Sequence, residues 1–162
     1  MSLTEDEERY WRAYLAETPD SPGKSQNVIA GHPGSPEIAD TLLALYLQGD
    51  KVAGSGLVED YTTTGDPLPQ VGDHWIVLDS LGSPRCILLT VRIENHKFLE
   101  VPEYIAAAEG EGDMSLAHWR SAHSGRYAAH LRDWGLTQIE DATVITEFFQ
   151  VVYAKDQAGD HT

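Results

Sequence analysis

The spacing of apolar positions predicts two amphipathic helices in the first third of the chain. In residues 4–17, Tyr10, Tyr14 and either Trp11 or Leu15 recur at helical spacing. Thr4 followed three residues later by a glutamate matches the capping-box pattern of a helix start. In residues 35–49, Ser35 caps a second helix with proline in its first turn; its apolar stripe is formed by Ile38, Leu42, Leu45 and Tyr46. Residues 18–36 are rich in Pro, Gly and Ser, which indicates a connector.

The apolar period then shortens, which predicts strands. Residues 74–79 and 85–95 form a hairpin around the turn sequence SLGSP, and residues 142–153 form a final strand. Residues 51–61 predict a strand bent by internal glycines. The remaining predicted elements are a prolyl loop at 62–73, a short strand and a helix within 98–109, and a helix at 115–134 stopped by a glycine.

Most predicted strands are separated by turns rather than by crossover helices. This arrangement favours a mixed or antiparallel curled sheet with helices packed on it over a doubly wound parallel sheet. The sequence therefore predicts an α+β fold, of which a small β-barrel is one form. At 162 residues the chain is expected to form one domain with its own core.

Composition and charge narrow the classes of partner. Hydrophobic residues make up 41% of the chain and charged residues 23%, values typical of a folded domain. The net charge of −15 disfavours duplex nucleic acid, whereas a small or single-stranded ligand is easier to accommodate. No apolar run approaches the roughly 18 residues of a membrane span, and the acidic N-terminus does not resemble a secretory signal, so a cytoplasmic protein without membrane contact is expected. The single Cys86, in an apolar run, predicts a core residue.

Residues 108–123, AEGEGDMSLAHWRSAH, place carboxylates at Glu109, Glu111 and Asp113. An EF-hand loop would need Gly and Glu where Met114 and Arg120 stand, so that interpretation fails. The intervening glycines permit a sharp turn. Mutual repulsion is expected to raise the pKa of the least solvated carboxylate.

Two interpretations of this loop stay open, a solvated acidic turn and a functional site. Asp113 or Ser115 can cap the following helix, and that role is the better one for Asp113. Glu111 is then the carboxylate most free to act on a ligand.

The histidines of the following helix do not predict a metal site. His123 and His130 are seven residues apart, about 10 Å along a helix axis, which one ion does not bridge. His123 falls on the apolar stripe of the helix, so a packed, hydrogen-bonded histidine is favoured over a functional one. We expect neither a metal nor a cofactor.

Lys51 is the second residue that suggests chemistry. It precedes Ala53, Gly54, Ser55 and Gly56, a small-residue backbone beside which a lysine can contact phosphate or activate a hydroxyl. The alternative is a solvated lysine at the start of a strand. The pattern lacks the Gly-Lys-Ser/Thr sequence of a phosphate-binding loop.

Three segments, residues 45–61, 68–101 and 107–123, resemble the ASCH domain family in its longer bacterial form. The resemblance runs from about residue 5 to Tyr153. It implies a PUA-like fold, a small curled β-barrel with surrounding helices and a ligand cleft on one side. It also implies the family's activities: RNA binding, hydrolysis of N4-acylcytidines in one branch, and ribonuclease activity in a long-form member. The implied domains are the ASCH domain at 37–153, an N-terminal helix and connector packed on it at 1–36, and a flexible tail at 154–162.

The hydrolase branch of the family uses a lysine, a threonine three residues later and a glutamate, which fall on Lys51, Gly54 and Glu111. The threonine hydroxyl is therefore missing. Ser55 would point to the opposite face of a regular strand and could substitute only at a bulge. A water activated by Glu111, with Lys51 stabilising charge, is the remaining route to hydrolysis.

The leading hypothesis is binding of a nucleobase, nucleoside or single-stranded RNA in a cleft formed by Lys51 and the Glu109–Asp113 loop. The first alternative is a hydrolase, an N4-acylcytidine amidohydrolase or a single-strand ribonuclease. The second is a non-catalytic regulatory or protein-interaction domain. The oligomeric state is left open. The candidate catalytic residues are Lys51, Glu111 and Ser55, and the candidate substrate-binding residues are Tyr61, Glu109, Asp113, Ser115 and Arg120.

Overall fold

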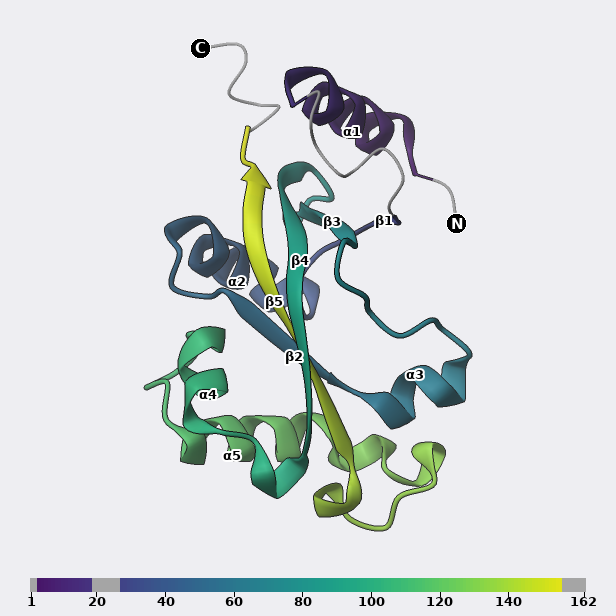
Figure 1. Ribbon diagram of the computed structural model, residues 1–162, viewed down its shortest axis with the longest axis vertical. Helices are drawn as coiled ribbons and strands as arrows, with labels where there is room; N and C mark the ends of the chain where they lie inside the picture. Colours follow the sequence, from purple (N-terminus) through teal and green to yellow (C-terminus); the bar gives the residue numbers. More distant parts are fainter. Residues whose placement is uncertain (1–2, 19–26, 156–162) are drawn as a thin grey trace. The chain divides into compact units, whose positions relative to one another are not determined.

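The computed structural model describes residues 3–18 and 27–155 (Figure 1). Residues 19–26 of the predicted connector and 156–162 of the predicted tail lie outside this description. The α-helices in the described part are α1 (Glu5–Glu17), α2 (Pro36–Gln48), α3 (Val58–Thr64), α4 (Glu103–Glu109) and α5 (Leu116–Tyr127). The strands are β1 (Val28–Gly31), β2 (Ala53–Leu57), β3 (His74–Leu78), β4 (Pro84–Lys97) and β5 (Thr143–Tyr153).

The strands form one sheet in the order β1-β3-β4-β5-β2. β1 pairs with β3 in parallel, whereas the β3–β4 and β2–β5 pairs are antiparallel. The prediction of a mixed sheet accompanied by helices is therefore confirmed, as is the hairpin between β3 and β4. Both helices predicted in the first third are present: Thr4 and Glu7 form the capping box of α1, and α2 ends at Gly49 in a left-handed conformation. Ser35 occupies the N-cap position of α2, but its side chain makes no capping hydrogen bond.

Several predicted boundaries were wrong. β1 lies in the segment predicted as a connector, and the strand predicted at 51–61 ends at Leu57, where α3 begins. The short strand predicted after residue 97 is a 3₁₀-helix, Phe98–Glu100. The helix predicted at 115–134 ends at Tyr127 and continues as two 3₁₀ turns. Segments of four residues are too short to show a helical period, which explains the misassignment of 58–61 and 98–101.

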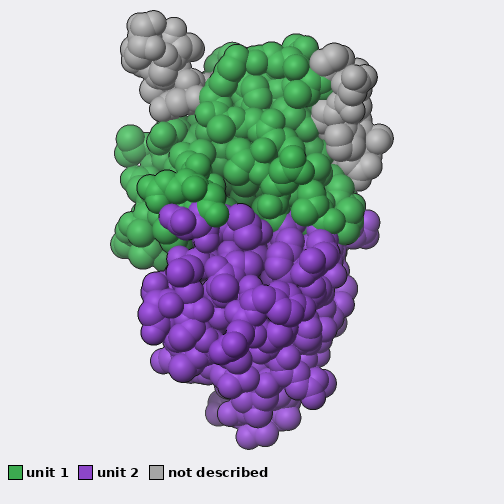
Figure 2. Space-filling view, turned by 60° about the vertical axis from the view of Figure 1, so that its left-hand side comes forward, with its two compact units in different colours: residues 1–49, 71–91, 149–162 green, residues 50–70, 92–148 purple. Residues whose placement is uncertain are grey.

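The chain divides into two compact units (Figure 2). Unit 1 comprises residues 1–49, 71–91 and 149–162. In this unit the aromatic residues of α1 pack on Ile76 and Ile87, and Leu43 and Tyr46 of α2 pack on a second apolar group that includes Cys86. The Cys86 side chain is fully buried, as predicted.

Unit 2 comprises residues 50–70 and 92–148. Its core joins α4, α5, the end of β2 and the start of β5; the buried members are Leu57, Phe98, Val101, Ile105, Ala106, Trp119, Ile139, Ala142 and Val144. All of the predicted site residues belong to this unit. Within the described residues, no helix is long and apolar enough to cross a membrane.

Candidate functional site

A glycine contact positions the acidic loop against Lys51. Gly110 ends α4 with φ +66°, and a Cβ atom at this position would lie 2.1 Å from the carbonyl oxygen of Asp50. Just beside it, the backbone N–H of Val52 donates to the carbonyl oxygen of Ala108 at 2.7 Å. Only glycine fits this conformation and this close approach, so the turn after α4 places Glu111 next to Lys51.

Ser115, rather than Asp113, is the N-cap of α5. The Ser115 hydroxyl accepts a hydrogen bond from the backbone N–H of His118 at 3.0 Å. Asp113 accepts from the backbone N–H of Ser115 at 2.9 Å, and its hydrogen bonds with Ser115 lower the pKa of its carboxyl. Asp113 therefore supports the turn that leads into α5 and is itself exposed.

Lys51 is buried, with 5% of its surface exposed, so the interpretation as a solvated lysine was wrong. Its Nζ donates to Glu111 Oε2 at 2.7 Å and to the carbonyl oxygen of Glu109 at 3.2 Å. The same ammonium lies 3.8 Å from Glu109 Oε1. One cation therefore serves two carboxylates, as a buried charge requires.

Glu109 is the most deeply buried of the three loop acids, 3% exposed. Its Oε2 accepts from Ser55 Oγ at 2.6 Å and from Trp119 Nε1 at 2.7 Å. The Ser55 hydroxyl also lies 2.7 Å from that of Thr146. Because the Ser55 proton is directed at the carboxylate, Thr146 is the donor in this second contact.

The expectation that Ser55 would need a bulge to reach the site was wrong. Ser55 pairs with Thr146 in the regular β2–β5 register. Lys51 lies two residues before β2 and four before Ser55, an even spacing that places both side chains on one face where the chain is extended. Both side chains consequently contact Glu109.

The ion pair with Lys51 shifts the pKa of Glu111. Burial acts to raise the pKa of the Glu111 carboxyl, but the charge of Lys51 and its hydrogen bond outweigh this effect, and the pKa is lowered. Glu111 is therefore ionised at neutral pH and retains partial exposure, with 26% of its side-chain surface accessible.

His123 is both a packed residue and a member of the site. Its ring stacks on Trp119 with 4.1 Å between centroids, and Nδ1 donates to the carbonyl oxygen of Trp119 at 2.8 Å. Its Nε2 lies 3.7 Å from Glu109 Oε1. Burial lowers the pKa of His123, and this effect exceeds the opposite influence of Glu109.

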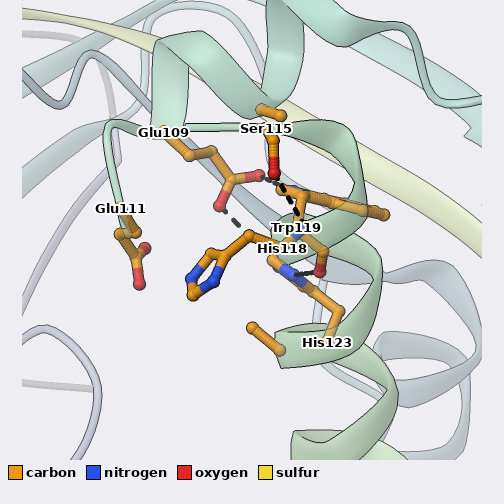
Figure 3. Close-up of a pocket in the computed structure, with 8 residues that line it drawn as sticks. Glu109, Glu111, Ser115, His118, Trp119 and His123 are labelled. Atoms are coloured by element: carbon orange, nitrogen blue, oxygen red, sulfur yellow. Dashed lines mark hydrogen bonds and ion pairs between the residues drawn. The ribbon is translucent and has the colours of Figure 1, made fainter. Parts of the chain in front are cut away.

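A small pocket opens between the acidic loop and α5 (Figure 3). We call it the Glu109 pocket; its lining is Ala106, Glu109, Glu111, Ser115, His118, Trp119, Ala122 and His123. Its enclosed part has room for about one water-sized group. His118 is exposed, whereas Glu109, Trp119 and His123 are buried, so the deep end of the pocket is the carboxylate–imidazole end. In the part of the chain that the structure describes, no group of three His, Cys, Asp or Glu residues is arranged to hold a metal ion.

Two predicted substrate-binding residues have other contacts. Tyr61 packs against Gly56, and burial, with the nearby Glu147 carboxylate, raises its pKa to about 12. Arg120 donates to the carbonyl oxygen of Leu99 at 2.8 Å. Neither residue lines the Glu109 pocket. Sequence reasoning missed Thr146 and Trp119, and it did not place His123 beside Glu109. The i, i+4 spacing of Trp119 and His123 was a signal for their contact.

The fold is of the α+β class and contains a buried lysine–carboxylate cluster, and similarity to known proteins shows its family. Residues 27–153 match the family model of the ASCH domain. The chain belongs to the ASCH domain family.

Two solved structures are similar to this chain. An ASCH domain from Lactobacillus crispatus JV V101 is 29% identical, with 94% of this chain and 98% of that chain covered and a TM-score of 0.86. A protein from Enterococcus faecalis V583 is 24% identical, with 99% and 95% covered and a TM-score of 0.81, which supports the fold. No curated protein matched the sequence. The predicted α+β, PUA-like fold is confirmed.

Proposed function

We propose that this ASCH domain binds one unstacked nucleobase, as a free nucleoside or within single-stranded RNA, at the Glu109 pocket. The observation that carries the proposal is the half-buried, ionised Glu111 beside the exposed His118 on one pocket rim. A carboxylate accepts hydrogen bonds from the N–H groups of a base edge, and an imidazole ring offers a surface for stacking. Both contacts require a base that is not paired in a duplex.

The size and charge of the site define how the ligand would bind. The enclosed part of the pocket is too small for a whole base, so only a polar group of the base edge would enter it. Lys51 is engaged by Glu111 and Glu109, and the chain carries a net charge of −15. We therefore expect base contacts, rather than phosphate contacts, to supply the affinity, and a nucleoside to bind at least as well as its monophosphate.

A screen of nucleosides, nucleoside monophosphates and short RNAs tests this function. Ligands would first be ranked by thermal shift and then mapped by chemical-shift changes in the ¹⁵N-labelled protein. We expect the largest changes at His118, Glu111 and the Trp119 indole. A folded protein that binds none of these ligands, or that binds them elsewhere, would contradict the proposal.

A second candidate function, hydrolysis of an acylated base or of RNA, is favoured by one contact. The Ser55 hydroxyl donates to Glu109 at 2.6 Å, and Lys51 lies 3.8 Å from the same carboxylate. In amide hydrolysis, Ser55 Oγ would bond to the acyl carbon while its proton passes to Glu109. Glu109 would return that proton to the leaving amine, and a water would then release the acid from Ser55.

This candidate is tested by incubation with N4-acetylcytidine and with labelled single-stranded RNA, followed by chromatography of the products. We expect Ser55→Ala and Lys51→Met to abolish turnover and Asp113→Asn to retain it. Equal turnover in all variants would assign the activity to another site or to a contaminant.

A further inference from the structure

The deep end of the Glu109 pocket contains an acceptor that the described chain does not use. His123 is 4% exposed, and its Nδ1 donates to the Trp119 carbonyl oxygen. Because burial lowers the pKa of His123, the ring is neutral at pH 7 and its one proton lies on Nδ1. Nε2 then carries a lone pair, and among the described residues it has no hydrogen-bond partner. A buried polar atom in this condition indicates that another molecule satisfies it.

A second acceptor faces this lone pair. Glu109 Oε1 lies 3.7 Å from His123 Nε2, and the two side chains point toward each other (Figure 3). The hydroxyl and indole donors that hold the carboxylate are both on its other oxygen, Oε2. Two acceptors at this separation can be bridged by one nitrogen placed about 2.9 Å from each.

The charges around the pocket favour a cationic donor. Counted by formal charge, one lysine (Lys51) lies among two glutamates (Glu109 and Glu111), so the formal charge of the cluster is −1. Arg126 also acts on His123 and Glu111, but it is exposed and water screens its charge. The net charge of −15 on the whole chain attracts further cations.

We infer that the Glu109 pocket binds a primary ammonium group, either the ammonium ion or the head of a small aliphatic amine. One N–H donates to Glu109 Oε1 and another to His123 Nε2, while the positive charge balances the cluster. The enclosed space matches a group of the size of water, so a quaternary ammonium is too large and has no hydrogen to donate. This site goes beyond the proposed nucleoside function and does not rest on it.

The test uses the ¹⁵N-labelled full chain at pH 7 and titrates methylammonium chloride against tetramethylammonium chloride at constant ionic strength. The indole N–H of Trp119 reports binding because it donates to Glu109, and that of Trp75, bonded to Gly31, is the internal control. We expect a saturable shift of the Trp119 signal with methylammonium alone. The pH midpoint of the His123 Cε1–H signal should also move to lower pH, since a bound cation opposes protonation of the ring.

A substitution at His123 tests whether its Nε2 atom is an acceptor for the bound methylammonium. His123→Phe retains an aromatic ring beside Trp119 and removes Nε2, and we expect methylammonium to bind about tenfold more weakly. His130→Phe, outside the pocket lining, is the control and should leave binding unchanged. If His123→Phe does not fold, the comparison of methylammonium with tetramethylammonium on the native chain still tests the ammonium site.

Three results would overturn the inference: no selective shift of Trp119, an equal response to tetramethylammonium, or a His123 ring already protonated at pH 7. A nucleoside titration of the same sample forms a separate arm. Methylammonium binding without nucleoside binding would contradict the proposed function and leave the ammonium site in place.

Discussion

The Ser55 hydroxyl donates to the buried carboxylate of Glu109 at 2.6 Å, across 54 residues of sequence. This contact joins β2 to the end of α4 and holds one oxygen of the acid that forms the deep end of the pocket. Trp119 supplies the second donor to that oxygen. Because the carboxylate is buried, each donor that it loses leaves charge less well compensated.

Removal of the Ser55 hydroxyl should therefore destabilise the domain. We expect Ser55→Ala to lower the free energy of unfolding by about 1–3 kcal/mol, the usual effect of an unsatisfied buried group. Urea denaturation at pH 7 measures it. Ser80→Ala, which removes a hydroxyl bonded to the exposed Asp40, is the matched control and should cost less than about 1 kcal/mol. Equal effects in the two variants would show that the Ser55–Glu109 hydrogen bond contributes no more to the free energy of unfolding than an exposed one.

Lys51 should be more important for stability than an exposed lysine. We expect Lys51→Met to lower the free energy of unfolding by about 3 kcal/mol because two carboxylates lose their shared cation. Adding Glu111→Gln should restore part of the loss, and the double-mutant cycle gives the coupling energy. Lys155→Met, whose pair with Glu17 is exposed, should cost less than about 1 kcal/mol. An additive cycle would rule out the proposed Lys51–Glu111 coupling.

The contribution of Glu111 to stability should depend on pH. Its pKa in the folded state is below its ordinary value of 4.5, so the unfolded chain takes up a proton first as the pH falls. The stabilisation is thus complete above pH 4.5 and is lost as the pH falls through the folded pKa. Unfolding free energies of wild type and Glu111→Gln should converge below pH 4.5. A constant difference down to the folded pKa would contradict the pairing with Lys51.

The close approach of Gly110 to Asp50 predicts a local steric effect. Gly110→Ala places a methyl group on the Asp50 carbonyl oxygen and should destabilise the domain by at least about 2 kcal/mol more than Gly135→Ala. Gly135 has a similar positive φ, and a Cβ atom there would meet no other atom within 4 Å, so its substitution reports backbone strain alone, about 1 kcal/mol. Thermal or urea unfolding of both variants makes the comparison. Equal losses would mean that the loop moves away without cost.

The fold was predictable where the pattern of hydrophobic positions extended over several helical turns or along a whole strand. The stripe of Ile38, Leu42, Leu45 and Tyr46 predicted α2, although Ile38 is exposed in the structure. The apolar runs around the turn at 80–84 predicted the β3–β4 hairpin. The segment 58–61 was too short to show a helical period, so α3 was missed. β1 was missed within the predicted connector because a four-residue strand that pairs with a distant partner has little sequence signal of its own.

The site was predictable only in part. The resemblance to the family predicted that Lys51 and Glu111 share one site, and in the structure Lys51 Nζ lies 2.7 Å from Glu111 Oε2. Residue spacing could not show that Glu109 is buried while Asp113 is exposed, since the glycines between them remove any fixed period. The contact of Ser55 with Thr146 depends on a strand register across 91 residues, which no local pattern encodes.

The most direct test of the proposed function is a calorimetric titration of the native chain, Glu111→Gln and Asp113→Asn with the nucleoside that ranks first in the thermal-shift screen. Glu111 lines the Glu109 pocket, whereas Asp113, an acid of the same loop, does not. We predict saturable binding to the native chain and to Asp113→Asn, with affinity for Glu111→Gln about tenfold weaker. Equal affinities in all three proteins, or no heat of binding with any of them, would contradict nucleobase binding at this pocket.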